Sequence, residues 1–117
     1  RPGRPCKAYE KDGRLVFILP GNPMAAYLCT MMLVLPLLKS ECFVTQKAIN
    51  SENLKVKSGR ANAVFGNVAD GKFIATDGGK YGSGMINHIL KSDFVLITSP
   101  DQGEILQNSE ISLIKLP

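Results

Sequence analysis

A short turn with a proline at each end is the part of this sequence whose residue types best suit the binding of a ligand. An apolar run over 15–19 ends at the tetrapeptide Pro20–Pro23, and a long apolar stretch begins directly after it. This pattern predicts a strand, a tight loop and a helix, with backbone N–H groups and the positive helix end directed at one spot that suits an anion. Each proline fixes its own φ, and Gly21 allows a turn or a close ligand approach. The plain alternative is a βα connection without a ligand, since such loops are commonly this short.

A second candidate is the glycine-rich segment over 77–84. It lacks the G-x-x-x-x-G-K-[ST] spacing of a phosphate loop, and it lacks the strand and helix that flank a dinucleotide-binding loop, so a β connection is the simpler interpretation. Ser83 lies between two glycines and could donate its hydroxyl and nearby N–H groups to an anion. His88 has no partner that spacing can assign, and we expect it to be structural.

Composition narrows the class of protein. The 117 residues are 44% hydrophobic and 21% charged, and the net charge of +4 is spread along the chain. A nucleic-acid surface would show a dense basic stripe with aromatic residues, so we expect no nucleic-acid partner. The apolar run over 24–38 is too short to span a membrane, and we expect no membrane partner.

The three cysteines, Cys6, Cys29 and Cys42, have no C-x-x-C spacing, and the chain has one histidine, so we expect no zinc site. Cys29 lies in the apolar stretch and is expected to pack there. This use of cysteine is typical of a reducing, cytoplasmic compartment. The sequence begins at Arg1 and not Met, which we interpret as a piece of a longer protein.

Local signals predict an α+β fold in two parts. Residues 1–40 are expected to contain a strand over 6–9, a turn at Asp12-Gly13, a buried strand over 15–19 covered on both faces, and a helix over 24–39 that Pro36 kinks or tightens. Residues 41–117 are expected to form a small β-barrel or sandwich, with a bulge at Gly66 and one or two helical turns over 85–90. Its expected strands cover 54–57, 61–69, 72–76, 93–98 and 111–116, and residues 42–49 mix β-formers with polar residues.

Two motifs carry a resemblance to a known family. Residues 1–5 read R-P-G-R-P, and residues 19–26 read L-P-G-N-P-M-A-A before an apolar helix that contains Pro36. The sequence resembles the C-terminal portion of the molybdopterin molybdenumtransferase family (MoeA and the gephyrin E domain), which carries K-P-G-K-P, then L-P-G-N-P-V-S-A and a helix ending in V-x-P-x-L. Gly82-Ser83 and the strand over 93–98 also look like the C-terminal domain of that family.

The resemblance implies a fold and a reaction. Residues 1–40 would be the strand-loop-helix remnant of an α/β molybdopterin-binding domain, and 41–117 the mostly β, barrel-like C-terminal domain. Family members insert molybdate into adenylylated molybdopterin, release AMP and use a divalent cation such as Mg²⁺. The active cleft forms in a homodimer. The metal ligands are expected in the portion that this chain lacks.

The resemblance also implies roles for individual residues. Pro20 and Pro23 match the prolines of the active-site loop and are the catalytic candidates. The substrate-binding candidates are Arg1, Arg4, Gly21, Asn22 and Ser83.

Three departures weaken the match. Ala25 stands where the family has a serine, Gly84 where it has a histidine, and Phe65 near an expected arginine. We therefore expect that this chain alone does not turn over substrate. The alternative reading is a non-catalytic β-rich module for interaction or assembly.

Overall fold

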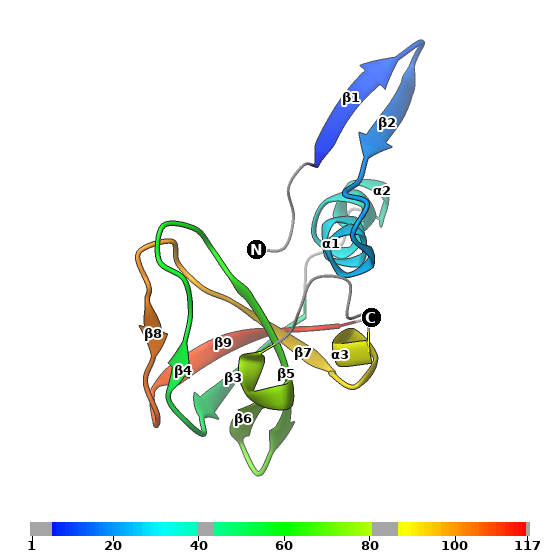
Figure 1. Cartoon of the computed structure of the whole chain (residues 1–117). Coiled ribbons are helices and arrows are strands. Elements are labelled where there is room, and N and C mark those ends of the chain that lie inside the picture. Colours follow the sequence, from blue (N-terminus) through cyan, green and yellow to red (C-terminus); the bar gives the residue numbers. More distant parts are fainter. Residues whose placement is uncertain (1–5, 40–43, 81–86, 117) are drawn as a thin grey trace.

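The computed structural model describes residues 6–39, 44–80 and 87–116. Along the chain, a two-stranded hairpin leads into a long helix, and a closed five-stranded barrel follows. Figure 1 shows the helix between the projecting hairpin and the barrel, which gives the molecule its elongated extents of 50 × 27 × 26 Å. The predicted α+β class with a small barrel-like part is confirmed.

The hairpin pairs β1 (Lys7–Lys11) with β2 (Arg14–Ile18) in antiparallel register. Its predicted turn is confirmed, because Asp12 and Gly13 both have positive φ angles, 53° and 75°, as a tight hairpin turn of the primed type requires. The expectation of a strand covered on both faces is wrong here. The described sheet has only these two strands, and Leu15 is 56% exposed.

The helix runs from Pro23 to Lys39, in good agreement with the prediction of 24–39. It consists of α1 (Pro23–Cys29), a π-helical turn η1 (Thr30–Val34) and α2 (Leu35–Lys39). In the π turn the Leu35 N–H donates to Thr30 O, five residues earlier. Pro36 lacks an N–H, and in a regular α-helix its ring would clash with the carbonyl four residues before it. The wider turn accommodates Pro36, so the expected tightening is wrong.

Five strands close the barrel in the order β3-β6-β5-β7-β9. They are β3 (Thr45–Asn50), β5 (Ala63–Ala69), β6 (Lys72–Ala75), β7 (Phe94–Ile97) and β9 (Glu110–Lys115). The smaller elements are β4 (Leu54–Lys55), which pairs with β8 (Glu104–Ile105), the 3-10 turn η2 (Thr76–Gly79) and the helical turn α3 (Asn87–Leu90).

Gly66 does not form the predicted bulge. It pairs in regular register with Ala75 on β6 and with Phe94 on β7. A Cβ at this position would collide with the carbonyl oxygen of Ile74 and the ring of Phe73. The glycine therefore permits the close approach of β6, and not an extra residue in β5.

Alternate residues of the barrel strands build two apolar clusters. The inner cluster fills the barrel with Ala48, Leu54, Val64, Phe73, Ala75, Leu96, Ile105 and Leu113. The outer cluster joins the helix to the barrel through Met24, Leu28, Met31, Ala63, Phe65, Ile89, Val95 and Leu116. The outer cluster includes residues from both sides of residue 40, so the helix and barrel share one core. The division at residue 40 stays a prediction.

None of the helices in the described ranges is both long and apolar enough to cross a membrane.

Candidate oxyanion loop

The loop between β2 and α1 has a buried base and an open tip. Pro20 is buried, Gly21 and Pro23 are exposed, and Asn22 is half-buried. Gly21 does not have a positive φ, and a Cβ added to it would have no atom within 4 Å. Its backbone therefore faces open space, as a close ligand approach requires. The sequence identified this loop because prolines and glycine mark turns independently of tertiary contacts.

Some of the N–H groups at the N-terminus of α1 already donate hydrogen bonds within the protein. Asn22 is the N-cap, and its Oδ1 accepts from the Ala25 N–H at 3.1 Å. The Asn22 carbonyl accepts from the Ala26 N–H at 2.9 Å. Pro23, at the first helical position, has no N–H. Within the described residues, Met24 is the remaining donor of the first turn, so an anion here would rely on Met24, the loop amides and the helix dipole.

Three predicted site residues, Arg1, Arg4 and Ser83, lie outside the described residues. The hairpin register nevertheless shows at which end of the hairpin the described chain begins. Lys7 pairs with Ile18, so the start of β1 and the loop after β2 lie at the same end of the hairpin. Lys7 thus brings an exposed cation close to the loop in the fold, which the sequence did not single out.

The first turn of α1 and the helical turn α3 contribute to one apolar cluster. Met24, the second residue of α1, packs in the same cluster as Ile89 of α3. The helical turn α3 follows the glycine-rich region directly in the chain. The cluster therefore joins the helix that follows the loop to α3, whereas the candidate Ser83 lies outside the described residues.

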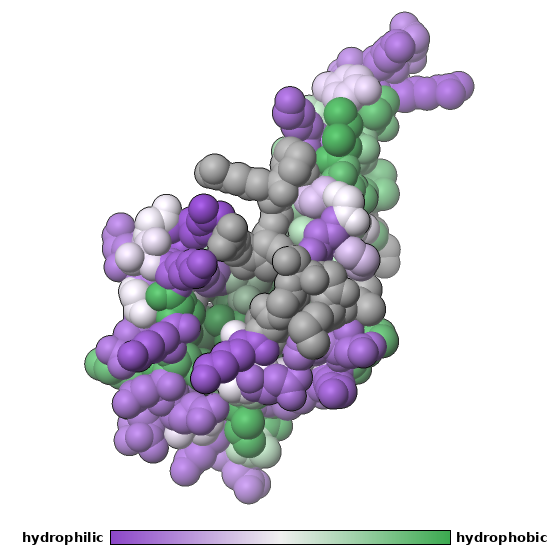
Figure 2. Space-filling view, in the orientation of Figure 1, coloured by the Kyte–Doolittle hydropathy of each residue, from purple (hydrophilic) through white to green (hydrophobic). Residues whose placement is uncertain are grey.

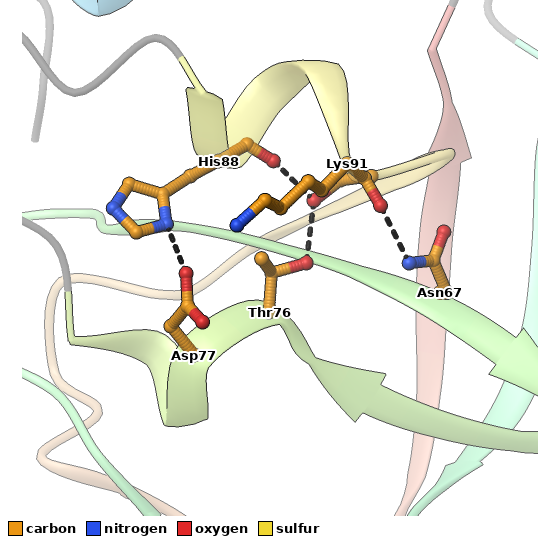
Figure 3. Close-up of polar contacts among 6 residues, drawn as sticks. Asn67, Thr76, Asp77, His88 and Lys91 are labelled. Carbon is orange, nitrogen blue, oxygen red and sulfur yellow. Dashed lines mark hydrogen bonds and ion pairs between the residues drawn. The ribbon is translucent and has the colours of Figure 1, made fainter.

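A polar network holds α3 on the barrel (Figure 3). His88 is buried, and its Nδ1 lies 2.6 Å from Asp77 Oδ2. Ser92 Oγ donates to His88 O at 2.6 Å and lies 2.6 Å from Thr76 Oγ1. Asn67 Nδ2 donates to Lys91 O at 2.8 Å. His88 is thus structural, as expected, although its spacing from Asp77 follows no pattern that identifies the two residues as partners.

The backbone at Asp77 adopts a costly conformation. Asp77, Gly78 and Gly79 have consecutive φ values of 50°, 65° and 75°, in the left-handed region. Asp77 lacks the freedom of glycine there, and its contact with His88 offsets part of that strain. The network therefore fixes both flanks of the glycine-rich region.

Two of the departures from the family pattern lie at buried positions. Ala25 is 3% exposed in the first turn of α1, and Phe65 is fully buried in the cluster between the helix and the barrel. At this position Phe65 packs in the apolar cluster and does not supply the positive charge that an arginine would carry. The third departure, Gly84, lies outside the described residues.

The described residues contain no cluster of three or more histidine, cysteine, aspartate or glutamate side chains suited to a metal ion. They therefore do not provide a set of ligands that fits Mg²⁺, and no chemical step is assigned to a metal here.

Comparison with known proteins gives matches among solved structures. No family model and no curated protein matches the chain. A molybdopterin biosynthesis MoeA protein from Pyrococcus horikoshii OT3 matches over 99% of this chain and 30% of its own, with 23% identity and a TM-score of 0.81. A molybdenum cofactor biosynthesis protein from Pyrococcus furiosus matches over 99% of this chain and 42% of its own, with 25% identity and a TM-score of 0.81.

A further structure of a molybdopterin biosynthesis MoeA protein from Pyrococcus horikoshii matches over 98% of this chain and 29% of its own, with 19% identity and a TM-score of 0.80. This chain therefore spans less than half the length of the structures it matches. At these identities the likeness establishes the fold. The resemblance to the molybdopterin molybdenumtransferase family is confirmed at that level: the chain has the fold of part of the MoeA proteins.

Proposed function

We propose that this chain is the C-terminal portion of a molybdopterin molybdenumtransferase of molybdenum cofactor biosynthesis. In this proposal the Pro20–Pro23 loop forms part of the floor on which molybdate meets adenylylated molybdopterin. The observation that carries the proposal is the location of this open loop. It lies at the junction of helix and barrel, in a fold that covers nearly the whole chain and matches MoeA structures.

The loop would act by position and charge. Pro20 and Pro23 restrict the backbone, so the amides of Gly21 and Met24 lose little entropy when they bind an oxyanion. The positive end of the helix favours negative oxygens at the same place. Arg1, Arg4 and Ser83 would supply further cationic and hydroxyl groups. With the two substrates held close together, molybdate would be inserted into the molybdopterin and AMP would be released.

The exposed hairpin supports the proposal that the chain is one part of a larger site. Leu15, Ile18 and Leu19 are apolar and exposed, although an apolar β-strand run of this kind is typical of a sheet covered on both faces. Contiguous exposed apolar surface commonly marks a face that another chain segment or subunit covers. We propose that the rest of the α/β domain covers it, and that the complete enzyme is a cytoplasmic homodimer that uses Mg²⁺.

A molybdate titration followed by backbone amide NMR tests the binding role. We expect saturable shifts at Gly21, Asn22 and Met24, together with Ser83, at constant ionic strength. Gly21→Val fills the open space beside the loop and should weaken molybdate binding at least about tenfold. Gly103→Val is the matched control, because an added Cβ there also meets no atom within 4 Å.

The titration also separates this proposal from the alternative. If molybdate and AMP leave the loop amides unchanged, or if Gly103→Val weakens binding as much as Gly21→Val, the loop is not the oxyanion site. Shifts confined to the β surface upon addition of a protein partner would instead favour the interaction module. The chain alone should release no AMP when it is incubated with adenylylated molybdopterin, molybdate and Mg²⁺. Release at the rate of a full-length enzyme would contradict the proposal that this chain supplies only part of the site.

A further inference from the structure

Two of the three cysteines contact each other across the base of the hairpin. Cys6, the first described residue, is half-buried, and Cys29 lies on the buried face of α1 with only 6% exposure. The Cys29 side chain is in hydrogen-bond contact with that of Cys6, and both are thiols in this structure. They come from two different elements and are 23 positions apart in the sequence.

The fold explains this contact. Lys7 pairs with Ile18, so Cys6 lies at the end of the hairpin where β2 leaves towards the loop. The chain then turns through Pro20–Pro23 into α1, and Cys29 is the last residue of that helix. The contact between the two side chains therefore joins the start of β1 to the end of α1.

We propose that Cys6 and Cys29 form a reversible intramolecular disulfide when the protein encounters a small-molecule disulfide such as oxidised glutathione. The Cys6 thiolate attacks one sulfur of the oxidant, forms a mixed disulfide and releases one glutathione thiolate. Cys29 then loses its proton, its sulfur attacks the Cys6 sulfur, and the second glutathione leaves. The two protein thiols lose two electrons in total, and one oxidised glutathione becomes two reduced molecules.

The environments of the two thiols set the order of these steps. Cys6 is the more exposed of the two residues, whereas Cys29 is buried, so the first attack is assigned to Cys6. Burial, followed by the hydrogen bond and charge of Cys6, raises the pKa of the Cys29 thiol to about 11. Burial, the largest of these causes, still raises the pKa of Cys29 when Cys6 is held in the mixed disulfide. Because the thiolate is the attacking species, the second step is the slow one at neutral pH and should accelerate about tenfold per pH unit.

The bond would fasten the start of β1 to the end of α1. If the loop has the proposed function, the disulfide would also restrict the approach of the preceding residues, which include Arg1 and Arg4. The disulfide itself does not depend on that function, and the test below measures it without any enzymatic assay.

The test uses the wild-type chain and a Cys42→Ser variant, which removes the third cysteine. Each is incubated with oxidised glutathione, the remaining thiols are alkylated, and the products are identified by mass spectrometry. We expect the Cys42→Ser variant to lose the mass of two hydrogen atoms and to gain no alkyl group, and the wild type to show the same loss together with one alkyl group on Cys42. Both proteins should give one cross-linked peptide that joins Cys6 to Cys29. The oxidised form should melt higher by an amount on the order of 10 °C, and dithiothreitol should reverse both changes.

Single variants separate the two steps. Cys29→Ser should stop at a mixed disulfide on Cys6, and Cys6→Ser should leave Cys29 largely unmodified in the folded protein. The inference is overturned if glutathione stays attached to Cys6 in the Cys42→Ser variant at pH 8 to 9. It is also overturned if the wild type joins Cys42 in place of Cys29, or if closing of the disulfide does not accelerate with pH.

Discussion

The barrel and the hairpin–helix part place their large apolar side chains differently. In the barrel part, the side chains that are almost completely buried are Phe65, Phe73, Val95, Ile105 and Leu113. In the hairpin and the outer helix, many large apolar side chains are exposed, among them Tyr9, Leu15, Ile18, Leu33, Leu37 and Leu38. Figure 2 shows this apolar surface along the projecting part, whereas the barrel face in the same view is largely polar.

The difference follows from how each part completes its sheet. The barrel closes on itself, so every strand of it has two neighbours and one shared interior. The hairpin has two strands and two open edges, and such a unit is marginally stable by itself in water. We infer that the barrel supplies most of the stability of this chain, and that the helix transmits some of it to the loop through the outer cluster.

The largest expected effect comes from removing a barrel side chain. Phe73→Ala should lower the free energy of unfolding by about 3–5 kcal/mol, because it leaves a cavity in the inner cluster. Leu15→Ala, in the hairpin, should change it by less than about 0.5 kcal/mol. Urea denaturation measures both values. A loss above about 2 kcal/mol for Leu15→Ala would mean that Leu15 is buried in solution. The hairpin and the barrel would then not differ in the burial of their apolar side chains.

Gly66→Ala should destabilise the chain by about 3 kcal/mol or more, since the new methyl group would meet the Ile74 carbonyl and the Phe73 ring. Gly103→Ala is the control, because its added methyl group meets open space. Thermal or urea unfolding of both variants gives the comparison. Equal stabilities of the two variants would show that β5 and β6 are not packed as closely as described.

Alkaline pH should act on the hairpin–helix part through Cys29. Its pKa in the folded chain is raised from 9.0 to about 11, so the stabilisation is complete below pH 9 and is lost as pH rises towards 11. The loss should reach about 2 to 3 kcal/mol. Burial also raises the pKa of Tyr27, which adds a loss in the same direction above pH 10.

Urea midpoints from pH 8 to 11 test this dependence. Cys29→Ala is the matched variant, and its stability should fall less steeply than that of the wild type over this range. An identical slope in the two proteins would contradict the assignment to Cys29, whatever the absolute stability of the variant.

The smallest effect is expected at the helix cap. Asn22→Ala should lower stability by about 1 kcal/mol, because the Ala25 N–H loses its side-chain acceptor. Asn22→Asp keeps an acceptor and a favourable charge at the helix N-terminus, and should stay close to the wild type. If the two substitutions are equivalent in thermal unfolding, the side chain of Asn22 does not cap the helix.

Short-range signals made much of the fold predictable. Asp12-Gly13 and Asp70-Gly71 mark hairpin turns because they tolerate positive φ, and both turns are present. The helix was predictable from its apolar spacing together with the N-terminal proline. The candidate loop was found for the same reason, since Pro20, Gly21 and Pro23 define their own backbone.

Features that depend on distant partners could not be predicted. Leu15 is exposed because β1 and β2 form a sheet of two strands within the described residues, and the role of Gly66 depends on the approach of β6. The strand β8 exists because β4 pairs with it. Likewise, Asp77 and His88 come together only when η2 and α3 dock on the barrel, and no spacing rule encodes that contact.

Amide hydrogen exchange tests most directly whether the closed barrel is more stable than the two-stranded hairpin. We predict that amides paired within β5, β7 and β9 exchange only with global unfolding. Amides paired between β1 and β2 should exchange at least about 100-fold faster. Equal protection of the hairpin and the barrel amides would contradict this account.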